Sequence, residues 1–382
     1  MALSSRIPSI KLVISYILDW IIIIGIAAVG GGVSFISPYR RPFSPVDLSI
    51  SYPHVEHDLI STVVLVVISL IAPAIIIFLY SAILIPWPGK QSRTSQSTFW
   101  KRKLWEFNAG WMGLALSYAL AFMITQGIKN LIGKPRPDLL SRCQPDLANI
   151  ADHVVGGYFG RDVAPTWTLV SSSICTQTDH ALLDEGFRSF LSGHSSNAWA
   201  GLTYLSLWLA SKLNLCIPYL HPQTMINEKR QAEVKAASAV DDRSTLLPLH
   251  YHDPNSNATS RPVVAFERAA APPLFGVAFC LVPVCVAFYI GSTRYVDFKH
   301  KGLDIFSGSV LGIMTAWLGF RLYHGSLTRG EGWAWSPRHE DKAFAVSSGS
   351  DGWVGGGSMP NNQSRPSTER PMTVGSESGM SK

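Results

Sequence analysis

The sequence predicts an all-α fold, a six-span transmembrane helical bundle, and two features of its composition point to this class. Hydrophobic residues make up 47% of the 382 residues and charged residues only 15%, which is unlike an ordinary soluble domain. The hydrophobic residues also gather in runs of about 20, the length that a helix needs to cross the hydrocarbon core of a bilayer. Strongly polar stretches separate these runs, as they do in proteins that cross a membrane several times.

Six stretches are apolar over a sufficient length to be transmembrane spans. They lie near residues 11–36, 59–87, 109–132, 194–216, 273–292 and 303–324. The first is too long for the hydrophobic region of a cleavable signal peptide and lacks an obvious small-residue cleavage site, so we expect it to stay as an anchor. Asp19 lies within it, towards its cytosolic half, and we expect this charge to serve helix packing.

The distribution of positive charge predicts the orientation of the spans. Lysine and arginine cluster in the connections between spans two and three and between spans four and five, at Lys90, Arg93, Lys101, Arg102, Lys103, Lys229, Arg230, Lys235, Arg243, Arg261 and Arg268. Both connections should be cytosolic, which places both termini there and turns the other three connections to the lumen or exterior. The formal charge of +6 therefore does not indicate a nucleic-acid partner. Asn257 and Asn362 begin formal glycosylation motifs that this topology keeps away from the glycosylation machinery.

Two segments are too poor in apolar residues to bury a core, and we expect both to be disordered. Residues 222–270 would form a cytosolic insertion, and residues 326–382 would form a cytosolic tail. This division leaves residues 1–10 as a cytosolic N-terminus and residues 11–325 as the membrane domain.

The five cysteines include no Cys-x-x-Cys pair of the kind that binds metals. Cys143 and Cys175 both lie in the acidic connection of residues 133–193, which the predicted topology places outside the cytosol. They could form a disulfide in an oxidising lumen, and the alternative is a pair of free thiols.

Three polar clusters lie at span ends, all on the predicted non-cytosolic side. The first runs from Lys129, still inside span three, to Arg136, which Pro135 and Pro137 flank. A lysine within an apolar helix needs an anion or a wet cavity, and the prolines stiffen the backbone around the guanidinium. The pair suits a phosphate. The alternative is that Lys129 reaches to the membrane interface and Arg136 is an ordinary flanking charge.

The second cluster, Ser192-Gly193-His194, opens span four. A helix start of this kind presents free backbone N–H groups to an anion, and Gly193 permits a close approach. His194 could then donate a proton. The alternative is that Ser192 only caps the helix and His194 is an interfacial polar residue.

The third cluster joins spans five and six and contains Arg294, His300 and Asp304. Because His300 and Asp304 are four residues apart, they would face the same side of a helix. The carboxylate could then hold one imidazole nitrogen and leave the other free to attack, which is the arrangement of an activated nucleophile. The alternative is a surface His–Asp pair of little consequence.

A metal site is the competing interpretation of these clusters, because His194, His300 and Asp304 are residue types that ligate zinc. The three basic residues of the clusters would surround such an ion with positive charge. A cage of this kind repels a divalent cation and attracts a phosphate dianion, so we expect an anion site without a metal or another cofactor.

Taken in order, the clusters resemble the signature of the type 2 phosphatidate phosphatases, also called lipid phosphate phosphatases, and the fungal diacylglycerol pyrophosphate phosphatases among them. That signature reads Lys-x6-Arg-Pro, Pro-Ser-Gly-His and Ser-Arg-x5-His-x3-Asp. It matches Lys129 to Arg136-Pro137, Leu191-Ser192-Gly193-His194, and Thr293-Arg294 to His300 and Asp304. Leu191 stands where proline is usual and Thr293 where serine is common, and we expect altered loop geometry rather than loss of activity. The resemblance covers roughly residues 10–325.

The resemblance implies a metal-independent hydrolysis through a phosphohistidine. His300 would attack phosphorus, Asp304 would orient His300, and His194 would protonate the departing lipid alkoxide. The phosphoryl oxygens would be held by Lys129, Arg136, Ser192, Gly193 and Arg294. Basic side chains would thus do the electrostatic work that magnesium does in other phosphotransfer enzymes.

The implied partner is a membrane lipid with a terminal phosphate, which would be phosphatidate, lysophosphatidate or diacylglycerol pyrophosphate. A vacuolar, Golgi or plasma-membrane location fits a site that faces outward. One alternative is a lipid phosphotransferase of the sphingolipid headgroup type, in which an alcohol replaces water as acceptor. Another is a non-catalytic lipid- or phosphate-binding membrane protein, although a pure binder needs neither a nucleophile nor an acid.

Overall fold

The computed structural model describes residues 9–84, 96–215, 272–327, 334–338 and 343–344, without the side chains of residues 96–99. The predicted insertion, most of the predicted tail and both glycosylation motifs lie outside these residues, so the expectations about them stay predictions. The chain divides into two units, residues 1–16 with 336–382 and residues 17–335. In the first unit, the Arg338 amide donates to the Tyr16 hydroxyl at 2.8 Å.

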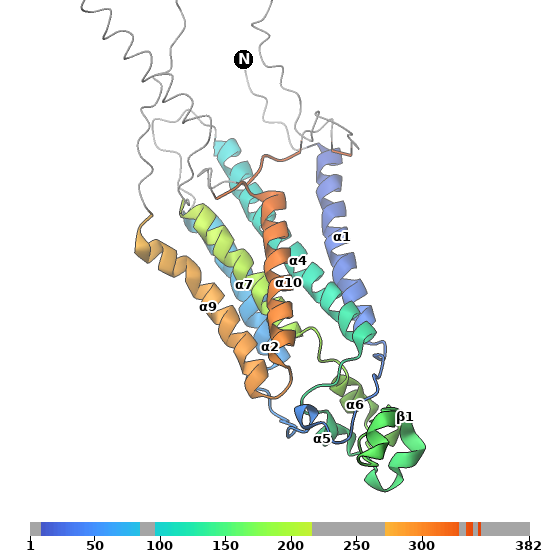
Figure 1. Cartoon of the computed structure of the whole chain (residues 1–382). Coiled ribbons are helices and arrows are strands. Elements are labelled where there is room, and N and C mark those ends of the chain that lie inside the picture. Colours follow the sequence, from blue (N-terminus) through green and yellow to red (C-terminus); the bar gives the residue numbers. More distant parts are fainter. Residues whose placement is uncertain (1–8, 85–95, 216–271, 328–333, 339–342, 345–382) are drawn as a thin grey trace, which may run out of the picture. The chain divides into compact units, whose positions relative to one another are not determined.

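Long helices dominate the second unit (Figure 1). The first is α1 (Ile10–Ser34), which begins in the first unit. The second span is built from four consecutive segments, α2 (Thr62–Val66), η2 (Val67–Ile71), α3 (Ala72–Leu79) and η3 (Tyr80–Leu84). The remaining long helices are α4 (Gln96–Ile132), α7 (Gly193–Lys212), α9 (Leu274–Val296) and α10 (Gly302–Tyr323). Among the described residues, five helical stretches are long and apolar enough to cross a membrane: Ile10–Ser34, Thr62–Ile83, Trp100–Ile132, Leu274–Val296 and Gly302–Tyr323. The chain is therefore a multi-span, mainly helical membrane protein, as predicted.

The predicted fourth span, α7, is a long helix that is less apolar than the five. It packs against α4, α9 and α10, and it buries Ser195, Ser196 and Asn197 together with Tyr204 and Trp208. Because protein rather than lipid surrounds this helix, its polar residues find partners inside the bundle. The Ser195 hydroxyl, for example, lies 2.8 Å from that of Ser309 in α10.

Glycines let the neighbours of α7 approach it closely. A Cβ atom on Gly201 would lie only 1.7 Å from the Ser69 carbonyl oxygen in the second span. In α10, a Cβ on Gly312 would lie 2.5 Å from the Ser196 carbonyl oxygen. These contacts are with backbone, which cannot move aside, so the small residues fix how tightly the bundle closes around α7.

The polar connections at one end of the bundle form a small structure of their own. It contains η1 (Leu48–Ile50), α5 (Leu139–Cys143), η4 (Leu147–His153), β1 (Val154–Gly156), η5 (Tyr158–Asp162), β2 (Leu169–Val170), η6 (Ser172–Ile174) and α6 (His180–Gly186). The two strands pair antiparallel, with Val154 opposite Val170. Phe43, Leu139 and Phe187 are buried in its apolar core. Cys143 and Cys175 form a disulfide there.

Candidate active site

Six of the eight predicted site residues line one cavity of about 170 Å³ at this end of the bundle. They are Lys129, Arg136, Gly193, His194, Arg294 and His300. They come from the end of α4, the turn that follows it, the start of α7, and the end of α9 with its connection to α10. We call this the phosphate cavity, because its basic side chains converge from segments far apart in the sequence. Ser192 and Asp304 do not line it but contact residues around it.

His300 is held by a backbone carbonyl. Its side chain is buried, and Nδ1 donates to the Ser189 carbonyl oxygen at 2.7 Å. This bond fixes the ring proton on Nδ1 and leaves the lone pair on Nε2. Burial, followed by the charges of Arg136 and Lys129, lowers the pKa of His300 well below its usual range. The imidazole is therefore neutral at physiological pH, as a nucleophile must be.

Asp304 does not hold His300 directly, which corrects the expected His–Asp contact. The helix α10 begins only at Gly302, so His300 precedes it and the two side chains do not share a helical face. The Asp304 carboxylate instead accepts from Lys134 Nζ at 2.6 Å and from the Ser189 hydroxyl at 2.7 Å. In the described part of the chain no hydrogen bond joins it to His300. Ser189 therefore connects the two, through its hydroxyl and its carbonyl.

The Ser192-Gly193-His194 cluster combines a cap with a site. Ser192 is the N-cap of α7, and its hydroxyl accepts the Ser195 amide at 3.4 Å, as the capping alternative expected. Gly193 lets Lys129 come close, because a Cβ there would lie 3.1 Å from Lys129 Nζ. His194 lines the cavity, and its Nε2 donates to the Ile60 carbonyl oxygen at 3.1 Å.

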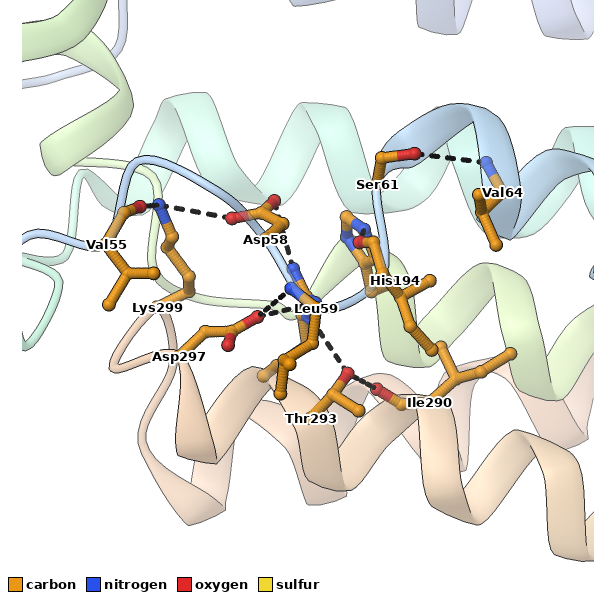
Figure 2. Close-up of polar contacts among 12 residues, drawn as sticks. Val55, Asp58, Leu59, Ser61, Val64, His194, Ile290, Thr293, Asp297 and Lys299 are labelled. Atoms are coloured by element: carbon orange, nitrogen blue, oxygen red, sulfur yellow. Dashed lines mark hydrogen bonds and ion pairs between the residues drawn. The ribbon is translucent and has the colours of Figure 1, made fainter.

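Arg294 lies beside one hydroxyl and two carboxylates. Its Nε donates to the Thr293 hydroxyl at 3.3 Å, Nη1 lies 3.1 Å from Asp58, and Nη2 lies 2.7 Å from Asp297. Thr293 also donates to the Ile290 carbonyl oxygen at 2.8 Å, a contact visible in Figure 2. A serine hydroxyl could make the same two bonds, so the threonine at this signature position preserves them.

Arg136 is also buried, but it pairs with one carboxylate, whereas Arg294 lies beside two. The Nη1 of Arg136 lies 3.2 Å from the Glu185 carboxylate, whereas its Nε has no hydrogen-bond partner among the described residues. Glu185 also pairs with Arg142 at 3.2 Å. The charge of Arg136, with a further contribution from Arg142, lowers the pKa of Glu185 to about 2, so this carboxylate is ionised. The unpaired Nε is a donor that a bound anion could use.

Three charged residues of the cavity were missed from the sequence: Asp58, Glu185 and Lys299. Lys299 stands directly before His300 within the third cluster, so its position was a signal that could have identified it. Its Nζ donates to the Val55 carbonyl oxygen at 2.8 Å and lies 3.3 Å from Asp58 (Figure 2). Asp58 and Glu185 stand in connections without any motif, and only the fold brings them to the site.

The formal charges around the phosphate cavity favour a dianion. Four basic side chains line it, and the two carboxylates offset half of their formal charge, which leaves two formal positive charges beside the neutral His300. A phosphate monoester at neutral pH carries close to two negative charges. The formal charges of the cavity therefore match those of a phosphate dianion, and both His194 and His300 belong to its lining.

The profile of the PAP2 superfamily matches residues 110–327, more than half of the chain, and this range contains all eight predicted site residues. "Probable diacylglycerol pyrophosphate phosphatase 1" of Schizosaccharomyces pombe is 26% identical over 74% of this chain and 72% of its own length. "Diacylglycerol pyrophosphate phosphatase 1" of Saccharomyces cerevisiae is 29% identical over 76% and 73%. "Probable lipid phosphate phosphatase 4" of Arabidopsis thaliana is 21% identical over 80% and 72%.

No solved structure matches the chain. The matched range and the similarity to phosphatases over most of both chains agree with a cavity built for a phosphate dianion beside a neutral histidine. The chain belongs to the PAP2 superfamily and is a phosphatase of that superfamily.

Proposed function

We propose that this protein hydrolyses the terminal phosphate of a membrane lipid through a phosphohistidine on His300, without a metal ion. Phosphatidate, lysophosphatidate and diacylglycerol pyrophosphate are the candidate substrates, the last because two of the relatives are named for it. The observation that carries the lipid assignment is an apolar groove that shares four lining residues with the phosphate cavity.

The apolar groove has a volume of about 400 Å³ and lies between α1, the second span and α4. Trp20 and Ala27 line it from α1, and Ala115 lines it from α4. It shares with the phosphate cavity the lining residues Thr62, Leu65, Phe122 and Asn197. A ligand that fills both spaces must therefore join a phosphate to a hydrocarbon chain, which is the chemistry of a phospholipid.

The proposed reaction has two steps. His300 Nε2 attacks phosphorus, the bond from phosphorus to the lipid oxygen breaks, and a protonated His194 gives that oxygen a proton. Water then attacks the phosphohistidine and gives a proton to His194, the bond from His300 to phosphorus breaks, and inorganic phosphate leaves, so both histidines return to their starting states. Lys129, Arg136 and Arg294 would stabilise the charge on the phosphoryl oxygens in both steps.

Asp304 and Ser189 would position the nucleophile in this reaction. The Ser189 carbonyl oxygen keeps the His300 proton on Nδ1, and the Ser189 hydroxyl donates a hydrogen bond to Asp304. Lys134, at 2.6 Å, fixes the other oxygen of the same carboxylate. Asp304 would therefore act on His300 through Ser189 rather than by contact.

We also propose that the phosphate cavity faces a lumen or the exterior, as the charge distribution predicts. The disulfide between Cys143 and Cys175 supports this orientation, because it lies in the connections at the same end of the bundle and disulfides persist in oxidising compartments. A vacuolar, Golgi or plasma membrane would each satisfy this condition.

Substitution of the two histidines tests the mechanism. In detergent micelles with EDTA, the full-length protein should release phosphate from phosphatidate, His194→Ala should lose about 10²–10⁴-fold in kcat, and His300→Ala should lose all measurable turnover. His180→Ala is the control, because His180 is exposed at the start of α6. Loss of wild-type release in EDTA would contradict metal independence, and full activity of His300→Ala would exclude it as nucleophile.

A double-substitution cycle tests the role of Ser189. Ser189→Ala removes the hydroxyl and keeps the carbonyl, and Asp304→Asn removes the charge. If Asp304 acts through Ser189, each variant should lower kcat, by about tenfold or more, and the double variant should be little worse than the poorer single one. KM should change little in all three, because neither side chain lines the cavity. Fully additive losses would show that the two residues act independently.

Filling the apolar groove tests the lipid assignment. Ala27 lines the groove, whereas its neighbour Ala28 is exposed on α1. Ala27→Phe should lower kcat/KM for long-chain phosphatidate about tenfold, because the ring occupies space meant for a chain, and should spare a water-soluble phosphate monoester such as p-nitrophenyl phosphate. Ala28→Phe should change neither rate. Equal effects of the two substitutions on phosphatidate would remove the groove from the substrate site.

Cysteine labelling tests the orientation. In a chain without Cys216, Cys280 and Cys285, a cysteine at the exposed position Asp152 should react with a membrane-impermeant maleimide only on the non-cytosolic side of sealed vesicles. A cysteine at the exposed position Lys101 should react only on the opposite side. The reverse pattern would invert the topology.

A further inference from the structure

The Asp58 carboxylate pairs with two cations of the phosphate cavity, and one of them, Arg294, is a residue that the proposed function uses to hold phosphate. The carboxylate lines the phosphate cavity, lies 3.1 Å from Arg294 Nη1, and lies 3.3 Å from Lys299 Nζ. Asp58 comes from the connection before the second span, far in sequence from both partners. Figure 2 shows it directed toward Lys299, with Asp297 and Thr293 on the α9 side of the cluster.

Asp58 is the carboxylate partner of Arg294 that lines the cavity, so a phosphate that binds Nη1 there must compete with it. The three nitrogens of Arg294 face Thr293, Asp58 and Asp297. Asp297 is the fixed partner, because its side chain is 4% exposed, lies outside the cavity lining and also accepts the Leu59 amide at 3.2 Å. The Asp58 side chain is 28% exposed and lines the cavity, so it is the partner that phosphate can replace.

The backbone around Asp58 also contacts His194, the proton donor of the proposed reaction, so a movement of Asp58 would affect His194 as well. Residues 55–60, which we call the covering segment, make three backbone hydrogen bonds to side chains. The Val55 carbonyl accepts from Lys299, the Leu59 amide donates to Asp297, and the Ile60 carbonyl accepts from His194 Nε2. In a neutral His194 the proton on Nε2 is therefore used by the Ile60 carbonyl. Movement of Asp58 away from Arg294 would loosen the segment that holds this proton.

We propose that Asp58 is an internal competitor of phosphate at this site, a carboxylate that neutralises Arg294 and Lys299 before substrate binds and competes with phosphate for both. A phosphate dianion carries more charge and more acceptor oxygens than one carboxylate, so it displaces Asp58 when substrate enters. The return of Asp58 then disfavours bound inorganic phosphate and helps to expel the product. This inference rests on the proposed function, because it concerns the same phosphate.

Asp58→Asn tests the competition, since it removes the negative charge and keeps the size of the side chain. In the full-length protein, inorganic phosphate should inhibit phosphatidate hydrolysis with an inhibition constant about tenfold lower in the variant, and titration calorimetry should show the same gain in binding. Asp162→Asn is the matched control, because Asp162 is an exposed carboxylate outside the cavity lining. Its inhibition constant should equal that of the wild type.

An unchanged or weaker affinity of Asp58→Asn for phosphate would overturn the proposal, because Asp58 would then only orient Arg294. A wild type that neither hydrolyses phosphatidate nor binds phosphate would instead overturn the proposed function. Active wild type with no change in the variant would overturn this inference alone.

Hydrogen–deuterium exchange of the wild-type protein provides a measurement that does not depend on folding of a variant. Saturating inorganic phosphate should speed exchange in the peptide that contains residues 55–60, because displacement of Asp58 frees the covering segment. Ligands that only fill a cavity slow exchange in the segments that line it. Slower or unchanged exchange in this peptide would contradict displacement.

Discussion

Repulsion among the basic side chains of the phosphate cavity is the constraint around which this end of the protein is organised. Arg136 and Arg294 are buried, and with Lys129 and Lys299 they surround a space that holds only a small anion. Like charges brought together away from water destabilise a fold unless opposite charges face them. Glu185 faces Arg136, and Asp58 faces both Arg294 and Lys299. Internal carboxylates therefore compensate the charge of the basic side chains in this cavity.

A second constraint, the cost of unpaired polar groups in lipid, explains the central position of α7. A helix that carries His194 and several hydroxyl groups could not face lipid, where its polar groups would lack partners. The surrounding helices cover it, and glycines at Gly201 and Gly312 let their backbones approach within contact distance. Rigid packing along α7 then holds His194 at its start against the ends of α4 and α9.

Two kinds of environment meet at these helix ends. The phosphate cavity is charged, whereas the groove beside it is lined mainly by apolar side chains of α1, the second span and α4. Thr62, Leu65 and Phe122 belong to both linings. Under the proposed function, the headgroup phosphate would lie in the cavity while the hydrocarbon chain stays in the groove, so the reaction would not require the lipid to leave the membrane.

The sequence alone determined the helical membrane fold and most of the site. The length and apolarity of the spans follow from the cost of unpaired backbone in hydrocarbon, and this local rule identified five of the six spans as apolar helices. The predicted fourth span coincides with the helix Gly193–Lys212, but this helix is not among the five that are apolar enough to cross a membrane, and its polar residues face neighbours that the sequence does not display. Motif spacing likewise identified six residues that line one cavity.

Only the tertiary structure decided which groups hold those residues. His300 lies before the first turn of α10, so its partner is the Ser189 carbonyl and not Asp304, four residues away. Asp58 and Glu185 reach the cavity from separate connections with no motif around them. Hydrophobic periodicity and motif spacing are properties of neighbouring residues in the chain. Charge compensation and hydrogen bonding act between atoms in space, and the fold alone determines which of those atoms meet.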